Sequence, residues 1–83
     1  MGNCFITFRS VTFGQRSQRL LEQAGISCTL QRTPRWMEQQ GCGYCLKLRE
    51  DQCYRAVTVL RHHQAVFQKV YRQLDGEMEA VEL

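Results

Sequence analysis

The segment Cys-Gly-Tyr-Cys at positions 42–45 holds the residues of this sequence that are best suited to chemistry. Cys42 lies between Gly41 and Gly43, after a polar stretch and outside any helical or strand periodicity that would bury it. Glycines on both sides let backbone N–H groups approach the sulfur, which favours the nucleophilic thiolate over the thiol. We therefore predict that Cys42 is an accessible, reactive thiol.

Cys45 and two arginines complete the candidate site. The Cys-x-x-Cys spacing lets two sulfurs close a small disulfide ring or share a metal ion. In thioredoxin-type proteins such a pair opens a helix whose dipole lowers the first pKa, whereas here it opens a predicted strand. We interpret Cys45 as a resolving thiol that assists Cys42 or as a packing residue, with a Cys42/Cys45 dithiol redox module as the alternative. Arg32 and Arg35 are candidates to stabilise the Cys42 anion, although ordinary solvated charges explain them equally well.

The other three cysteines fall at predicted core positions. Cys4 and Cys28 lie on the apolar faces of two predicted strands, and Cys53 lies on the apolar stripe of a predicted helix. A free cysteine in such a position behaves as a small hydrophobic residue. We therefore predict that all three pack in the core as free thiols.

A zinc site is the other chemistry that cysteines and histidines can provide. His62 and His63 would have to join Cys42 and Cys45, but adjacent residues on a helix point about 100° apart. Zinc fingers space their histidines by three to five residues instead. We therefore expect no metal site and no resident cofactor, and we place both histidines at a helix C-terminus.

The composition favours one small cytoplasmic domain. The 83 residues are 43% hydrophobic, which leaves little volume for a deep substrate cavity. There is no phosphate-binding glycine loop, serine nucleophile elbow or pair of carboxylates in a plausible cleft, so we expect a protein that is not an enzyme. The sequence shows no secretory leader or membrane-length apolar stretch, and Ile6 stands where a myristoylation signal needs Ser or Thr. We therefore expect a cytoplasmic location and mostly reduced thiols.

The charges divide the chain into two parts. Residues 1–74 hold all eleven Lys and Arg but four of the eight acidic residues, and residues 75–83 hold the other four. A basic body suits an anionic partner, but net charge alone is weak evidence for nucleic acid, which we do not expect. We predict a single domain over 1–74 and an acidic, flexible tail over 75–83.

Hydrophobic periodicity predicts six elements and one long loop. Period-two alternation indicates strands, and apolar residues three and four apart indicate helices. The predicted order is a strand, a helix, two strands, a helix and a strand, over residues 4–8, 10–25, 26–31, 44–48, 50–63 and 66–74, with a loop over 34–43. This order predicts an α+β, ferredoxin-like βαββαβ sandwich with two helices on one face of a four-stranded antiparallel sheet. The open face, including Phe5, Thr29 and Lys47, would let a protein-interaction domain bind a partner or a second copy of itself.

Several of these residues together resemble a known family. The aromatic strand Phe5–Phe8, the helix end Leu20–Ile26, the Thr33-Pro34-Arg35 turn and above all Cys42-Gly43 are similar to the putative selenium/sulfur carrier protein-like family of small bacterial domains. This chain departs from the family in Glu38-Gln39-Gln40 before Cys42, where a serine-rich stretch is usual, and Cys45 is not a general family feature. The resemblance implies a carrier that holds sulfur or selenium on Cys42 as a persulfide or selenosulfide. It also implies a cysteine desulfurase-like donor and downstream acceptor proteins.

Overall fold

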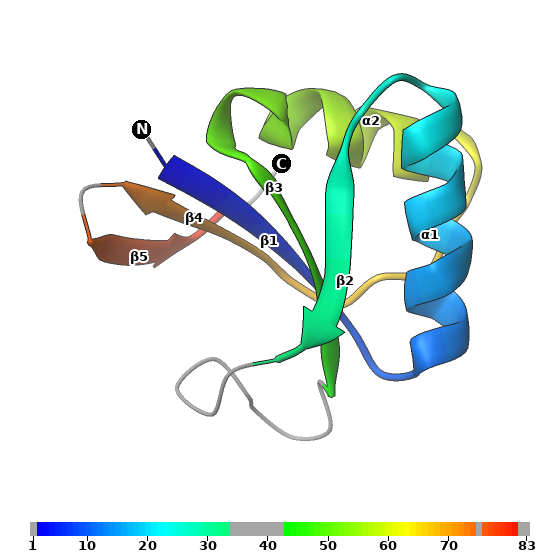
Figure 1. Ribbon diagram of the computed structural model, residues 1–83, viewed down its shortest axis with the longest axis horizontal. Coiled ribbons are helices and arrows are strands. Elements are labelled where there is room, and N and C mark those ends of the chain that lie inside the picture. Colours follow the sequence, from blue (N-terminus) through cyan, green and yellow to red (C-terminus); the bar gives the residue numbers. More distant parts are fainter. Residues whose placement is uncertain (1, 34–42, 75, 82–83) are drawn as a thin grey trace.

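The computed structural model describes residues 2–33, 43–74 and 76–81, and it is an α+β structure. Within these residues five antiparallel strands form one sheet, and two α-helices accompany it (Figure 1). In chain order the elements are β1 (Gly2–Phe8), α1 (Val11–Gln23), β2 (Cys28–Arg32), β3 (Tyr44–Arg49), the 3₁₀ turn η1 (Glu50–Gln52), α2 (Cys53–His62), β4 (Val70–Leu74) and β5 (Glu77–Ala80).

The sheet has the strand order β2-β3-β1-β4-β5, so the prediction of four strands was wrong. The additional strand, β5, lies in the stretch predicted as a tail and pairs antiparallel with β4. Gly76, with a φ of +83°, allows the tight turn between the two strands. Sequence periodicity did not predict β5 because the strand is short and acidic. It is stabilised by pairing with β4, which periodicity does not reveal. Its partners include Arg72, whose guanidinium pairs with Glu79.

Helix α1 lies within the range 10–25 that was predicted for it. The Ser10 side chain accepts a hydrogen bond from the Phe13 backbone N–H at 3.3 Å, which satisfies one of the unpaired donors at the start of the helix. The helix ends before Gly25, which adopts a φ of +82° that other residues rarely tolerate. The backbone N–H of Ile26 then donates to the Leu21 carbonyl, which closes the last turn.

Helix α2 begins differently from the prediction. The helix was predicted over residues 50–63, but Glu50 and Asp51 belong to η1, and the residue before the helix is Gln52. Gln52 makes no side-chain capping hydrogen bond. The predicted apolar stripe is confirmed, since the buried residues of α2 are Cys53, Ala56, Val57 and Leu60.

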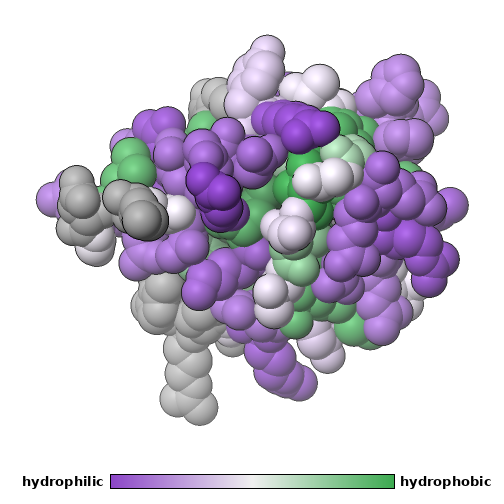
Figure 2. All heavy atoms as spheres, turned by 45° about the horizontal axis from the view of Figure 1, so that its top comes forward, coloured by the Kyte–Doolittle hydropathy of each residue, from purple (hydrophilic) through white to green (hydrophobic). Residues whose placement is uncertain are grey.

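One hydrophobic core lies between the sheet and both helices. It combines alternate residues of the central strands with the inner stripes of α1 and α2 and with Val70 of β4. Because side chains alternate across a strand, the core residues of β1 are Cys4, Ile6 and Phe8. In Figure 2, hydrophilic residues cover most of the visible face, and hydrophobic residues show mainly in a narrow band near its middle.

The opposite face of the sheet carries the residues that were predicted to share it. Thr29 pairs with Lys47, and Lys47 pairs with Phe5, so the three form one row across β2, β3 and β1. Thr29 and Lys47 are exposed, whereas Phe5 is 5% exposed and packs with Cys45 and Tyr71 in a second, smaller cluster. The row is therefore confirmed, but its aromatic member is buried rather than free.

The helices are also too short to cross a membrane. Among the described residues no helix has the length and apolar character that a bilayer span requires.

Truncating Leu21 tests whether the two helices depend on the shared core. Leu21 of α1 is fully buried, so Leu21→Ala removes apolar contacts and leaves a cavity. We expect a loss of about 3 kcal/mol in the free energy of unfolding, measured by urea denaturation. Gln23→Ala, an exposed change on the same helix, is the control and should stay within about 0.5 kcal/mol. Equal effects of the two variants would contradict this packing.

Candidate functional site

Strands β2 and β3 stay paired up to Thr33 and Gly43, the residues that flank the segment containing Cys42. Arg32 pairs with Tyr44 at the end of the ladder, and the Thr33 backbone N–H donates to the Gly43 carbonyl at 3.1 Å one step further. The chain between these two residues lies outside the described residues. Of the predicted site residues, this applies to Arg35, Gly41 and Cys42, whereas Arg32, Gly43 and Cys45 are described.

Arg32 and Cys45 are not brought together. The Arg32 guanidinium lies 5.7 Å from the centroid of the Tyr44 ring, a cation–π contact between neighbouring strands. Tyr44 and Cys45 are adjacent in β3, so their side chains point to opposite faces of the sheet. Arg32 is exposed and lies on the same face of the sheet as Tyr44. Its guanidinium is therefore not placed to stabilise a thiolate at Cys45.

Cys45 is a buried thiol on the face opposite the helices. It is 0% exposed and lies between Gln31 of β2 and Thr7 of β1. Burial raises the pKa of the Cys45 thiol, and contacts from the side chains of Thr33 and Gln31 lower it by less. The buried Thr33 Oγ1 makes no hydrogen bond of ordinary geometry, so its contact with the sulfur is weak. In this conformation the Cys45 sulfur is buried and its thiol ionises less readily than an ordinary cysteine, which does not suit an attacking thiol.

Cys28 is a second free thiol with low reactivity. It lies at the start of β2, partly buried, and its sulfur is 4.0 Å from the Gln18 carbonyl oxygen. Burial, assisted by the negative charge of Glu22, raises the pKa of Cys28 to about 11. The thiol is therefore almost fully protonated at neutral pH, in agreement with its predicted packing role.

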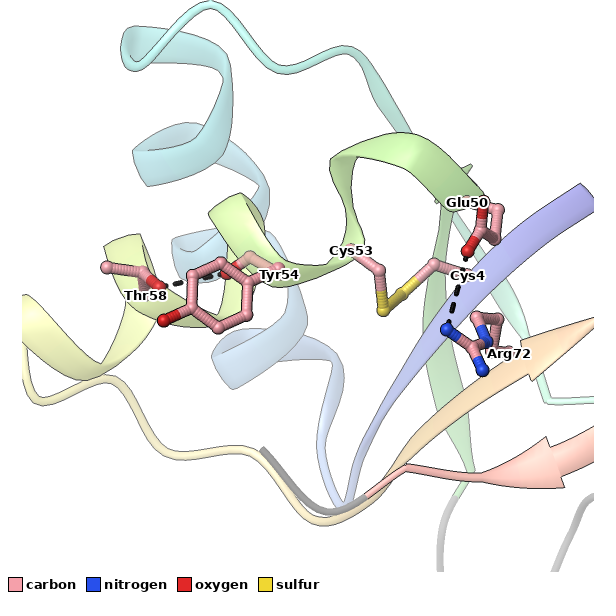
Figure 3. Close-up of a disulfide and its surroundings, with 6 residues drawn as sticks. All are labelled: Cys4, Glu50, Cys53, Tyr54, Thr58 and Arg72. Carbon is pink, nitrogen blue, oxygen red and sulfur yellow. Dashed lines mark hydrogen bonds and ion pairs between the residues drawn. A yellow bond between two sulfur atoms is a disulfide. The ribbon is translucent and has the colours of Figure 1, made fainter.

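Cys4 and Cys53 are joined as a disulfide between β1 and α2 (Figure 3). Both were predicted to pack as free thiols. The prediction of core burial is confirmed, but the prediction of separate thiols is wrong. The two residues are 49 positions apart in sequence, so no local pattern pairs them. The signal that could have suggested the pair is that each occupies the inner face of its own element.

The histidines lie at the end of α2, as predicted. His62 is the last residue of the helix, His63 follows it, and both are exposed. Their rings contact each other edge to face with centroids 5.3 Å apart. Within residues 2–33, 43–74 and 76–81, no three His, Cys, Asp or Glu side chains are grouped as a metal site would require.

The chain matches a known protein family. The model of a family described as putative Se/S carrier protein-like matches residues 3–72, which is most of the chain. No curated protein and no solved structure matches the chain.

Burial of Cys45 predicts slow modification in the folded protein. With iodoacetamide at pH 8, we expect Cys45 to react at least about 100-fold more slowly in the native state than in urea, because reaction requires local opening. Peptide mass spectrometry after timed quenching measures the rate for each cysteine separately. A native rate close to the rate in urea would contradict the burial.

The raised pKa of Cys28 predicts a steep pH dependence. Only about one Cys28 in a thousand is a thiolate at pH 8, so its alkylation rate should rise about tenfold per pH unit until pH approaches 11. Glu22→Gln removes a negative charge that opposes ionisation, so it should lower the pKa and speed alkylation at pH 8. Gln23→Ala is the control without a change of charge. Slower alkylation of Glu22→Gln would contradict the assigned charge effect.

Proposed function

Because the chain belongs to the putative Se/S carrier protein-like family, we propose that it carries sulfur or selenium on Cys42, as a persulfide or selenosulfide, and passes it between proteins. In this role the protein is a carrier rather than an enzyme. The chalcogen is its cargo, so the function requires no resident cofactor.

We choose Cys42 as the carrier thiol because of the bonding, burial and pKa of the other four cysteines. Cys4 and Cys53 are bonded to each other in this structure, and both residues are buried. Cys28 and Cys45 are free, but burial raises the pKa of each. A carrier thiol has to be accessible and at least partly ionised near neutral pH. Among the described cysteines none meets both requirements, which supports Cys42.

The chain around Cys42 provides the charge that a bound anion needs. Arg32, at the end of β2, is exposed, and Arg35 follows three residues later in sequence. We propose that these guanidinium groups stabilise the Cys42 thiolate and the persulfide anion formed from it, with Gly41 and Gly43 leaving backbone N–H groups accessible to the sulfur.

Loading is a transfer of one sulfur or selenium atom. The Cys42 thiolate attacks the outer sulfur of a donor persulfide, the sulfur–sulfur bond of the donor breaks, and the donor cysteine leaves as a thiolate. We propose a cysteine desulfurase-like protein as the donor. An acceptor thiolate then attacks the outer sulfur or selenium held on Cys42, and Cys42 leaves as a thiolate. The basic body of the carrier would attract acidic surfaces on these partners.

Cys45 has a secondary role in this proposal. Attack of its thiolate on the inner sulfur of a Cys42 persulfide would form a Cys42–Cys45 disulfide and release hydrosulfide, or hydroselenide from a selenosulfide. Because Cys45 is buried in the described conformation and burial raises the pKa of its thiol, this step requires prior exposure of its sulfur. The same burial weighs against a constitutive Cys42/Cys45 dithiol redox module.

The fold suits a carrier that meets its partners at the surface. The strand order β2-β3-β1-β4 and the single core beneath two helices support the ferredoxin-like plan, which β5 extends. We propose the cytoplasm as the location. The row of Thr29, Lys47 and Phe5 offers one polar and one basic exposed side chain for protein contacts, which keeps a non-catalytic interaction domain, including a homodimer, as the alternative.

Loading of Cys42 can be measured directly. After incubation with a cysteine desulfurase and cysteine, the intact mass should increase by one sulfur atom, and a thiol reductant should remove the increase. We expect Cys42→Ser to stay unmodified. Cys28→Ser, which removes a free thiol of raised pKa, is the matched control and should load like the wild-type protein.

Two outcomes would exclude Cys42 as the carrier thiol. One is an unmodified wild-type protein, and the other is equal loading of wild type and Cys42→Ser. Loading of Cys45→Ser at the wild-type level with slower release of hydrosulfide would assign Cys45 to the resolving step. Unchanged release in that variant would assign it to packing.

A further inference from the structure

The Cys4–Cys53 disulfide lies at the junction of β1, η1 and α2. Cys4 is 0% exposed on the inner face of the central strand, and Cys53 is 5% exposed as the first residue of α2. Figure 3 shows the bond running from the strand to the start of the helix, with the Glu50–Arg72 ion pair beside it. Neither the family match nor the carrier chemistry at Cys42 gives this bond a role.

The backbone at this junction accommodates both oxidation states. The two Cα atoms are 5.6 Å apart, within the usual range for a disulfide. Both residues also belong to the hydrophobic core, where a reduced cysteine packs as a small apolar side chain. Making or breaking the bond therefore requires no rearrangement of the sheet.

Arg72 places a guanidinium group on the same face of the sheet as Cys4. Arg72 of β4 is the cross-strand partner of Cys4, so the two side chains lie on the same face of the sheet. The Arg72 guanidinium pairs with Glu79 and lies 3.6 Å from a Glu50 carboxylate oxygen. Its Nε, however, is buried and has no hydrogen-bond partner among the described atoms. A Cys4 thiolate would supply an acceptor for this donor.

The start of α2 favours a thiolate at Cys53 in a different way. The N-terminal end of a helix carries a partial positive charge, and Gln52 does not cap it with its side chain, although the Cys53 N–H itself donates to the Glu50 carbonyl of η1. The two acidic residues just before the helix are both paired, Glu50 with Arg72 and Asp51 with Arg49. Their negative charges therefore oppose ionisation of Cys53 less than unpaired carboxylates would.

From these observations we propose that Cys4 and Cys53 form a reversible dithiol–disulfide couple that exchanges with a dithiol reductant, as a redox site separate from the Cys42 thiol. In the oxidised state the bond ties the start of α2 to the central strand. In the reduced state α2 is held by packing and by the hydrogen bond from Arg55 to the Ala24 carbonyl, and η1 keeps its ion pair with β4. Such reversibility is what a disulfide in a reducing compartment requires, since permanent structural disulfides are rare there.

The exchange proceeds in two balanced steps. A thiolate of the reductant attacks the sulfur of Cys53, the residue of the pair with the larger exposed fraction, and Cys4 leaves as a thiolate on the same face of the sheet as Arg72. The second thiol of the reductant then attacks its own partner sulfur in the mixed disulfide, and Cys53 leaves as a thiolate at the helix start. The reductant ends as a disulfide, and its two electrons and two protons reside on the Cys4 and Cys53 thiols.

A redox titration of the folded protein tests the couple. The protein is equilibrated in buffers with different ratios of reduced to oxidised dithiothreitol, trapped with iodoacetamide in urea after acid quenching, and analysed by peptide mass spectrometry. We expect Cys4 and Cys53 to become alkylated together, with one midpoint and a two-electron slope, while circular dichroism remains native. Alkylation of both in the most oxidising buffer, or of neither until the protein unfolds, would overturn the proposal.

Arg72→Gln tests the mechanism. Without the guanidinium beside Cys4, the leaving thiolate is less stable, and we expect reduction by dithiothreitol to slow several-fold. Arg19→Gln, an exposed change on α1, removes the same charge elsewhere and should reduce at the wild-type rate. If Arg72→Gln is reduced as fast as Arg19→Gln, the assigned role of Arg72 is wrong. If Arg72→Gln does not fold, the wild-type titration still decides whether the couple exists.

The Cys42→Ser variant separates this inference from the carrier function. It lacks the proposed carrier thiol, so the Cys4–Cys53 midpoint should be unchanged whether or not Cys42 carries a chalcogen. A midpoint that moves or disappears in Cys42→Ser would assign the exchange to the loop thiol and overturn the proposal of a separate couple.

Discussion

Burial of the inner face of β1 is the interaction on which the rest of the structure depends. Ile6 and Phe8 are fully buried in a core shared by both helices and by strand β3. β1 also pairs with β3 on one side and β4 on the other, so it contributes to both the core and the sheet. Because strand residues alternate between faces, this burial fixes the orientation of every side chain along the central strands.

The same alternation determines the chemistry of the sulfurs. Cys4 faces the helices and meets Cys53, whereas Cys45, in the neighbouring strand, faces the other way and is buried with Phe5 and Tyr71. A shift of β3 by one residue would place the Cys45 sulfur in the main core and Tyr44 on the outer face. Thiol reactivity in this protein is therefore a consequence of strand register, since cysteines of identical intrinsic chemistry differ in bonding, burial and pKa.

Arg72 connects the outer part of the sheet to the start of α2. Its guanidinium contacts Glu79 of β5 and Glu50 of η1 while its backbone pairs with Cys4 of β1. Exposed ion pairs stabilise a fold only weakly, so these contacts contribute more to position than to stability. They link β5 and the 3₁₀ turn to the residue of β4 that pairs with Cys4. A redox change at Cys4 and Cys53 would thus occur where three segments of the chain meet.

The sequence by itself determined the local elements and the candidate thiol. Period-two alternation predicted β1, β2 and β3, apolar residues three and four apart predicted α1, and Cys42-Gly43 led to the family that the comparison then matched. These features depend on neighbouring residues, which is why they can be predicted without a structure. The predicted last strand, by contrast, begins at Val70 rather than at residue 66, because pairing with β1 decides where it starts.

Only the tertiary structure decided which distant residues meet. It brought Cys4 to Cys53, Cys4 to Arg72, and the acidic segment at 77–80 to the free edge of β4. It also decided that Cys45 is buried, because that depends on Gln31 and Thr7 in neighbouring strands. A long-range contact such as Cys4–Cys53 has to offset the entropic cost of closing a loop of tens of residues, and no short window of sequence contains both partners.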